Sequence, residues 1–234
     1  MYSMVLLTTD TPHHRYFTRE ICRSANLLEI VVETSQTKPR FDTAHPYETR
    51  RDEYEREVLL DGERAELSEF ARVRHADRAN DAAVVKMLTE RAPQIIATFG
   101  TRLLKSEVIS AASVACVNLH GGDPRHYRGL DSHLWAIYHG DFDGLVTALH
   151  HVDLELDNGD LIDQKPIPIR RGMELYQLRS ENTKVCVDLV KRLLASQAEI
   201  QRSPQKSRGR YYSFMPVCLK DLCVERFRRY AGSI

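Results

Sequence analysis

The chain opens with two short apolar segments that flank a helical one. Met4 to Thr8 and Leu28 to Val32 have the length and composition of buried strands, and Pro12 to Ser24 places apolar side chains on one face of a helix. Two consecutive strands joined through a helix form a parallel pair, because the crossover returns the chain to run in the same direction. This opening therefore predicts an α/β fold, with a Rossmann-like, mostly parallel open sheet flanked by helices.

The rest of the chain continues this alternation. Val84, Val85 and Leu88 follow helical spacing with Asn80 as an N-cap, and a long amphipathic segment runs from Gly172 to Ile200. Ser132 to His139 is expected to be a helix that packs Trp135 inward, and Thr34 to Thr49 an exposed loop. Further strands are predicted at Ile95–Phe99, Ala111–Val117, Leu145–Val152 and Leu161–Ile167.

The C-terminal part is expected to form a small extension. We assign residues 1–200 to one catalytic domain and residues 201–234 to a linker, hairpin and helix packed on it. Gln201 to Arg210 is a polar, basic linker and the best candidate for a mobile segment, Tyr211 to Leu219 a hairpin or strand, and Asp221 to Tyr230 a helix. Tyr211 to Phe214 either offers an exposed strand edge for a homodimer or packs within its own chain.

Charge and cysteine usage exclude several classes of protein. Lys and Arg together number 33, and so do Asp and Glu, so nothing favours nucleic-acid or membrane binding. No apolar stretch approaches the roughly 20 residues that span a bilayer, and the start lacks secretory signal features, so a cytoplasmic location is expected. The 5 cysteines are odd in number and form no Cys-x-x-Cys pair, which favours reduced thiols.

No metal site is expected either. The histidines occur as the adjacent pairs His13-His14 and His150-His151, and neighbours on a strand point to opposite faces. Such pairs have poor geometry for sharing one ion.

Polar residues follow the apolar run that ends at Val117. The run continues into Asn118-Leu119-His120-Gly121-Gly122, and Leu156-Asp157-Asn158-Gly159 has the composition of a tight, exposed turn. Alternation along a strand points Asn118 and His120 to the same side. Alone, a histidine at a strand end is more often structural than catalytic, and an Asp before Asn-Gly usually forms a turn. Together, an amide, an imidazole and a carboxylate are groups that acyl transfer uses.

The stretch from Gln94 to Gln164 resembles the folate-dependent formyltransferases, which include glycinamide ribonucleotide transformylase, methionyl-tRNA formyltransferase and the sugar N-formyltransferases. The matching residues, in the family's order, are Asn118-Leu119-His120, Pro124, Tyr127-Arg128-Gly129, Gly144-Leu145-Val146-Thr147 and Leu156-Asp157-Asn158-Gly159. The resemblance implies that Asn118, His120 and Asp157 are catalytic and that 10-formyltetrahydrofolate is the cosubstrate. Asn118 would donate to the oxyanion, His120 would act as a base or stabilise the oxyanion, and Asp157 would favour the charged imidazole.

The resemblance also implies a folate-binding segment. Thr98 to Leu104 resembles the stretch whose backbone contacts the pterin ring, so Phe99, Gly100, Thr101, Arg102, Leu103 and Leu104 are predicted to bind folate. The Arg102 side chain is equally consistent with a surface charge. His150 and Asp153 are further folate-site candidates, although His150 is as well explained as a packed, hydrogen-bonded histidine.

Departures from the family pattern favour one branch. A glycine-rich phosphate loop is absent after the first strand, where Thr8 to Arg15 stands instead, which argues against glycinamide ribonucleotide. Gly121 to Arg125 replaces the usual Pro-Ser-Leu-Leu-Pro, and Asp123 adds a charge there. Little chain remains for the C-terminal domain of methionyl-tRNA enzymes, and Gly209 to Pro216 resembles short sugar N-formyltransferases.

We therefore expect formyl transfer to a nucleotide-linked 4-amino-4,6-dideoxyhexose, such as dTDP-4-amino-4,6-dideoxyglucose, in glycan biosynthesis. Transfer to another small amine, formyltetrahydrofolate hydrolysis, and an inactive folate-binding module are the alternatives. The predicted sugar-binding residues are His13, His14, Tyr127, Arg128 and Arg210, although each is also typical of solvated surface. Replacing Arg128 or Arg210 by Ala is expected to weaken nucleotide-sugar binding more than folate binding.

Overall fold

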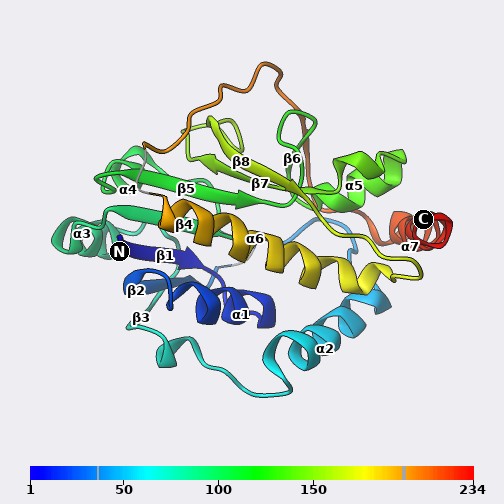
Figure 1. Ribbon diagram of the computed structural model, residues 1–234, viewed down its shortest axis with the longest axis horizontal. Coiled ribbons are helices and arrows are strands. Elements are labelled where there is room, and N and C mark those ends of the chain that lie inside the picture. Colours follow the sequence, from blue (N-terminus) through cyan, green and yellow to red (C-terminus); the bar gives the residue numbers. More distant parts are fainter. Residues whose placement is uncertain (36, 197–198) are drawn as a thin grey trace.

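The fold is built on a seven-stranded sheet with strand order β3-β2-β1-β4-β5-β7-β8 (Figure 1). The computed structural model describes residues 1–35, 37–196 and 199–234. The first five strands in chain order pair in parallel, and the last two pair antiparallel to their neighbours. The strands of this sheet are β1 (Ser3–Thr8), β2 (Asn26–Glu33), β3 (Val73–Ala76), β4 (Ile95–Phe99), β5 (Ala115–His120), β7 (Val146–His151) and β8 (Leu161–Pro166). The predicted α/β fold with a mostly parallel open sheet is confirmed.

Helices cover both faces of the sheet, as its apolar strands require. On one face, Phe17 and Ile21 of α1 and Leu189 of α6 pack against alternate strand residues such as Leu6 and Ile30. The opposite face is covered by α3 and α4. The helices of these layers are α1 (Pro12–Ile21), α3 (Ala82–Arg91), α4 (Ser106–Ile109) and α6 (Leu178–Ala195), which follows the short η3 (Leu175–Gln177).

Helix α2 (Pro46–Leu60) begins inside the segment that was predicted to be a loop. The His45 ring accepts a hydrogen bond from the Tyr47 amide, and the Glu48 carboxylate accepts one from the His45 amide. This reciprocal cap and the proline in the first turn set the start of the helix. The segment after it contains η1 (Leu67–Glu69) and no second long helix.

The N-terminal residue of α3 also differs from the prediction. Asp81, and not Asn80, is the N-cap. The Asn80 side chain instead donates to the Leu103 carbonyl and accepts from the Lys105 amide. Asn80 therefore fixes the loop after β4, a role that helix periodicity does not indicate.

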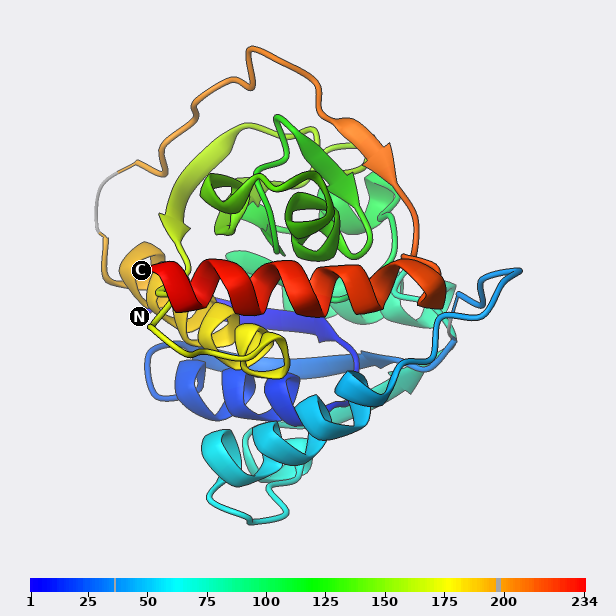
Figure 2. The ribbon, with the colours of Figure 1, turned by 90° about the vertical axis from the view of Figure 1, so that its right-hand side faces the viewer.

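The C-terminal part packs on helix α5 (Ser132–His139), which is followed by η2 (Phe142–Gly144). Strand β9 (Arg210–Tyr212) pairs in parallel with β6 (Tyr127–Gly129), and α7 (Val217–Ser233) then lies across the end of the molecule (Figure 2). The aromatic segment therefore packs within its own chain, and a strand rather than a hairpin precedes α7. Trp135 is half-buried, because its ring stacks on Tyr212 at a centroid distance of 5.0 Å.

The strand order fixes where a ligand can bind. From β1 the chain first moves outward to β2 and β3, and later returns to β4 on the other side of β1. The crossovers therefore diverge at the carboxyl ends of β1 and β4, where open parallel sheets leave a crevice. Within the described residues, no helix combines the length and apolarity needed to cross a membrane.

Candidate active site

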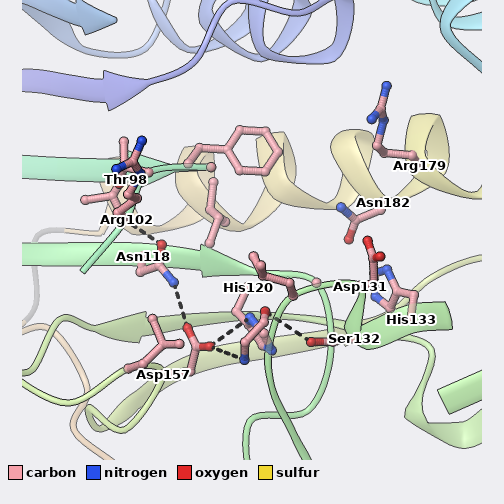
Figure 3. Close-up of a pocket in the computed structure, with 18 of the residues that line it drawn as sticks. Thr98, Arg102, Asn118, His120, Asp131, Ser132, His133, Asp157, Arg179 and Asn182 are labelled. Atoms are coloured by element: carbon pink, nitrogen blue, oxygen red, sulfur yellow. Dashed lines mark hydrogen bonds and ion pairs between the residues drawn. The ribbon is translucent and has the colours of Figure 1, made fainter. Parts of the chain in front are cut away.

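A pocket of about 500 Å³ lies at the carboxyl ends of β1, β4 and β5. Asn118, His120 and Asp157 lie in its middle (Figure 3). On one side it is lined by the loop after β4 and by the Asp157 loop. The other side, which we call the acceptor chamber, is lined by Tyr47, Arg51, Asp131, Arg179 and Asn182 together with His13 and His133.

The three residues that the sequence singles out converge in this pocket. The Asn118 Nδ2 atom lies 3.4 Å from Oδ1 of Asp157, and the His120 Nδ1 atom lies 3.6 Å from Oδ2 of Asp157. Asn118 and His120 share one side of β5, as alternation predicts. Asp157 reaches them from the loop after β7, whose last residues, His150 and His151, pair with Asn118 and Val117 of β5.

Hydrogen bonds orient the Asn118 amide. The Thr98 hydroxyl donates to Oδ1 of Asn118 at 2.6 Å, so Nδ2 faces His150 and Asp157. One N–H points to Nε2 of His150 at 3.0 Å, and the other makes the longer contact with Asp157. Nδ1 of His150 donates to the His151 carbonyl, so Nε2 is the ring nitrogen that faces Asn118, and it also lies 3.6 Å from Oδ1 of Asp157. His150 thus holds Asn118 in place.

A hydrogen bond to a backbone carbonyl fixes the tautomer of His120. Nε2 lies 2.8 Å from the Tyr127 carbonyl oxygen, which can only accept, so Nε2 carries a hydrogen. Nδ1 is therefore the nitrogen that gains or loses a proton, and it faces the Asp157 carboxylate. The ring is buried, with 6% of its surface exposed. This arrangement can exchange a proton at one defined atom.

Asp157 is buried with 6% exposure, which corrects the expectation of an exposed turn. Its backbone is left-handed, with φ 50°, and the Gly129 amide donates to Oδ2 at 2.8 Å. Burial raises the pKa of Asp157, but the nearby His120 and His150 rings and the Gly129 amide outweigh it and hold that pKa well below its usual range. The carboxylate is therefore ionised at neutral pH.

Side chains outside the pocket brace the Asp157 loop. The Arg128 guanidinium donates through Nε to the Leu156 carbonyl at 2.8 Å. From the C-terminal segment, Nε2 of Gln205 donates to the carbonyls of Asp157 at 3.1 Å and Gly159 at 2.7 Å. Gly159 is required there, because a Cβ atom would lie 1.9 Å from the His151 carbonyl oxygen. The segment that was predicted to be a mobile linker therefore supports this loop.

The segment predicted to bind folate lines one side of the pocket. Residues 98 to 104 all line it, as do His150 and Asp153. Gly100 has φ 81°, and a Cβ there would lie 2.7 Å from Nε2 of His14, so only glycine fits. The Arg102 amide donates to Glu33, and its guanidinium lies 2.5 Å from the Ser35 hydroxyl, so Arg102 anchors the loop from outside.

His13 and His14 line the pocket beside β1, where the sequence placed them. Burial, followed by the charge of Arg179, lowers the pKa of His13, and burial with His13 lowers that of His14. Both rings are therefore neutral at pH 7. They can accept or donate hydrogen bonds but supply no positive charge for a pyrophosphate.

Three other predicted sugar-binding residues lie outside this pocket. The Tyr127 ring packs against His139 and Tyr212, and the Arg128 guanidinium is held by the Leu156 carbonyl. Arg210 lies over the Tyr212 ring on the outer surface. The Tyr127 and Arg128 side chains are buried, so they cannot reach a ligand in the pocket.

The arginines that do line the acceptor chamber were missed by sequence reasoning. Arg51 on α2 and Arg179 on α6 stand far from the matched motifs. Arg179 donates to both carboxylate oxygens of Glu55, at 2.6 and 2.7 Å, and Arg51 pairs with Asp52. Both arginines stand on helix faces that are dense in charge, as solvated surfaces are. No sequence signal therefore marks Arg51 and Arg179 as pocket residues.

Asp123, the extra charge in the motif, also has a structural partner. Its carboxylate makes a two-pronged pair with the Arg125 guanidinium, at 2.9 and 2.7 Å.

Among the described residues, no group of three or more His, Cys, Asp or Glu side chains could hold a metal ion.

The chain is similar in sequence to one family of known proteins. Residues 21–188 match the family described as formyl transferase. Methionyl-tRNA formyltransferase from Caldanaerobacter subterraneus subsp. tengcongensis is 25% identical over 146 residues, which cover 61% of this chain and 46% of that protein. The chain thus spans less than half the length of this curated relative.

Two solved structures share the fold. A sugar N-formyltransferase from a Shewanella species superimposes with a TM-score of 0.60 at 14% identity, covering 96% of this chain and 87% of that one. HypX from Aquifex aeolicus, in complex with tetrahydrofolic acid, gives a TM-score of 0.55 at 17% identity, covering 98% of this chain and 34% of that one. At these identities the likeness extends to the fold alone.

Proposed function

The chain belongs to the formyl transferase family, and on that premise we propose that it transfers a formyl group from 10-formyltetrahydrofolate to the amino group of a nucleotide-linked amino sugar. The observation that carries this proposal is the convergence of the Asn118 amide, the His120 ring and the Asp157 carboxylate in one pocket. These three groups match the needs of acyl transfer: a donor for the oxyanion, a proton carrier and a charge that orients it.

Each residue has a role that its contacts support. The Asn118 N–H that makes only a 3.4 Å contact with Asp157 is available to turn to an oxyanion, a contact worth roughly 2.7–4 kcal/mol in other acyl transfers. Nδ1 of His120 takes or returns a proton beside the ionised Asp157. The neutral amine attacks the formyl carbon, its proton passes through this pair to the folate nitrogen, and the bond between the formyl carbon and that nitrogen breaks, which releases tetrahydrofolate.

The folate is expected to bind along residues 99 to 104. These residues line the pocket, and Gly100 leaves no room for a side chain. When bound, 10-formyltetrahydrofolate supplies the formyl group, and the Asp153 to Asp157 loop would cover it from the other side. HypX, which shares the fold, has a structure with tetrahydrofolic acid.

Three observations favour a nucleotide-linked amino sugar as the acceptor. The balanced charge of the chain gives no general attraction for a transfer RNA. A sugar N-formyltransferase covers almost all of this chain at the level of fold. The acceptor chamber adjoins the three central residues on the side away from the folate segment, so it can bring an amine to them (Figure 3). We propose dTDP-4-amino-4,6-dideoxyglucose as the first acceptor to test.

The test is an acceptor panel with 10-formyltetrahydrofolate. It comprises dTDP- and UDP-linked 4-amino sugars, glycinamide ribonucleotide and methionyl-tRNA, with tetrahydrofolate release and amine formylation both followed. Formylation of a nucleotide sugar alone is the expected result. Formylation of methionyl-tRNA would show that the acceptor is the one named for the curated relatives and not a nucleotide sugar. Folate release without any acceptor would show a hydrolase, and no release with any acceptor an inactive binding module.

A further inference from the structure

Asp131 stands on the wall of the acceptor chamber in an unusual conformation. Its backbone is left-handed, with φ 52° and ψ 29°, a region that few residues other than glycine, asparagine and aspartate adopt. It is the N-cap residue of α5, yet its side chain makes no capping hydrogen bond. An N-cap aspartate ordinarily turns its oxygen to the first free amides of the helix. Here the carboxylate has been turned elsewhere.

The carboxylate is held by one oxygen only. Oδ2 accepts a hydrogen bond from the Met215 amide at 2.8 Å. Within the part of the chain that the structure describes, Oδ1 has no hydrogen-bond partner and Asp131 forms no ion pair. Figure 3 shows this carboxylate on the same side of the pocket as Asn182 and Arg179, facing into the chamber. Asp131 is thus an anchored carboxylate with one oxygen directed at the ligand space.

The cations near Asp131 attract its charge but form ion pairs with other carboxylates: Lys220 is the charge that acts most on it, and its Nζ is held by Glu48 and the Thr43 carbonyl. Arg179 and Arg51 are already paired with carboxylates of α2. The His133 ring donates from Nε2 to the Val146 carbonyl, and burial lowers its pKa to about 4, so it is neutral. Burial, partly offset by the Met215 amide, raises the pKa of Asp131. A ligand group that donates a hydrogen bond would relieve this desolvation.

We propose that Asp131 binds a hydrogen-bond-donating group of the acceptor, its ammonium or a hydroxyl next to it, and so selects acceptors that carry such a donor. The inference rests on the proposed function for the occupant of the chamber. Asp131 acts by positioning: it holds this group beside the formyl carbon, and an ammonium bound there gives up one proton through Nδ1 of His120 before the neutral amine attacks. No residue of the family pattern supplies this charge, since Asp131 follows the matched Tyr127-Arg128-Gly129 segment.

The variant Asp131→Asn isolates the charge. Asparagine tolerates the left-handed backbone and still accepts the Met215 hydrogen bond, so folding should be kept. The matched control is Asp143→Asn, an exposed aspartate outside the pocket. For both variants, KM and kcat are measured with dTDP-4-amino-4,6-dideoxyglucose, and affinity is measured for the unreactive folate 5-formyltetrahydrofolate. The melting temperature is recorded for each.

Asp131→Asn is expected to raise the acceptor KM by about tenfold or more, the effect of losing one charge-assisted hydrogen bond, with folate affinity unchanged. Binding of dTDP-6-deoxyglucose, which differs from the amino sugar only by a hydroxyl in place of the amine, separates the two sources. If the wild type binds the amino sugar more tightly than its hydroxyl analogue and the variant does not, Asp131 binds the ammonium. If the variant binds both ligands more weakly than the wild type by the same factor, Asp131 binds a sugar hydroxyl. An unchanged KM, or a folate affinity that falls in parallel, overturns the proposal.

If the wild type formylates no nucleotide sugar, the proposed acceptor fails separately. The role of Asp131 is then tested with two small nucleophiles: methylamine, which is charged at neutral pH, and hydroxylamine, which is uncharged. A loss confined to methylamine supports the role of Asp131, and equal rates in variant and wild type with both contradict it.

Discussion

One carboxylate oxygen of Asp157 lies 3.6 Å from Nδ1 of His120, the ring nitrogen that is not engaged by a backbone carbonyl. The distance is longer than a direct hydrogen bond, so a bridging water or a small closure of the loop would complete the contact. The pair lies in a buried setting, where a charge acts more strongly than in water.

Asn118→Ala and His120→Ala are each expected to lower kcat by roughly 100- to 1000-fold, because each removes a group that acts on the developing charge or on the proton. The affinity for 5-formyltetrahydrofolate should change little, since the folate segment is left intact. His75→Ala, an exposed histidine on β3, is the control. A near-normal kcat in either pocket variant would refute the role assigned to that residue.

Asp157 should make stability depend on pH in acid. Its pKa is lowered in the folded state, so its stabilising contribution is complete above the unfolded value of about 3.9 and is lost as the pH falls toward the folded value. Asp157→Asn cannot titrate and lacks this term. Melting temperatures from about pH 7 to about pH 3 should therefore fall more steeply for the wild type than for the variant. Parallel curves would show that Asp157 titrates alike in both states.

Gln205→Ala is expected to impair activity without unfolding the protein. It removes two hydrogen bonds to the carbonyls of Asp157 and Gly159, each worth about 1 kcal/mol, so the loop should become less well positioned. A drop in kcat of about tenfold is predicted, since a loosely held catalytic group loses its orientation. Gln201→Ala, whose side chain is exposed, is the control. Equal activity of the two variants would exclude the bracing role.

Gly159→Ala should destabilise the fold by roughly 1–3 kcal/mol, because its Cβ would overlap the His151 carbonyl oxygen and force the loop away from β7. The free energy of unfolding in urea provides the measurement. Gly232→Ala is the matched control, since a Cβ there meets nothing within 4 Å and the residue lies in helix α7. Similar stabilities for the two variants would contradict the steric argument.

The fold class and the three central residues could be predicted from sequence for physical reasons. Buried parallel strands must be short apolar runs, so β1, β2 and β4 are visible in the chain, and period-two alternation places Asn118 and His120 on one side. The motif order then links them to Asp157. The strand predicted at Ala111–Val117 instead begins at Ala115 and continues to His120.

Only the tertiary structure decided what surrounds these residues. The burial of Asp157, the support of its loop by Gln205, and the placing of Arg179 and Asp131 on the chamber wall all depend on contacts between segments far apart in the chain. Arg128 looked like a sugar-binding cation, yet packing turned its guanidinium to the Leu156 carbonyl. Sequence patterns report the neighbours of a residue along one element, whereas side-chain partners across elements are set by how those elements pack.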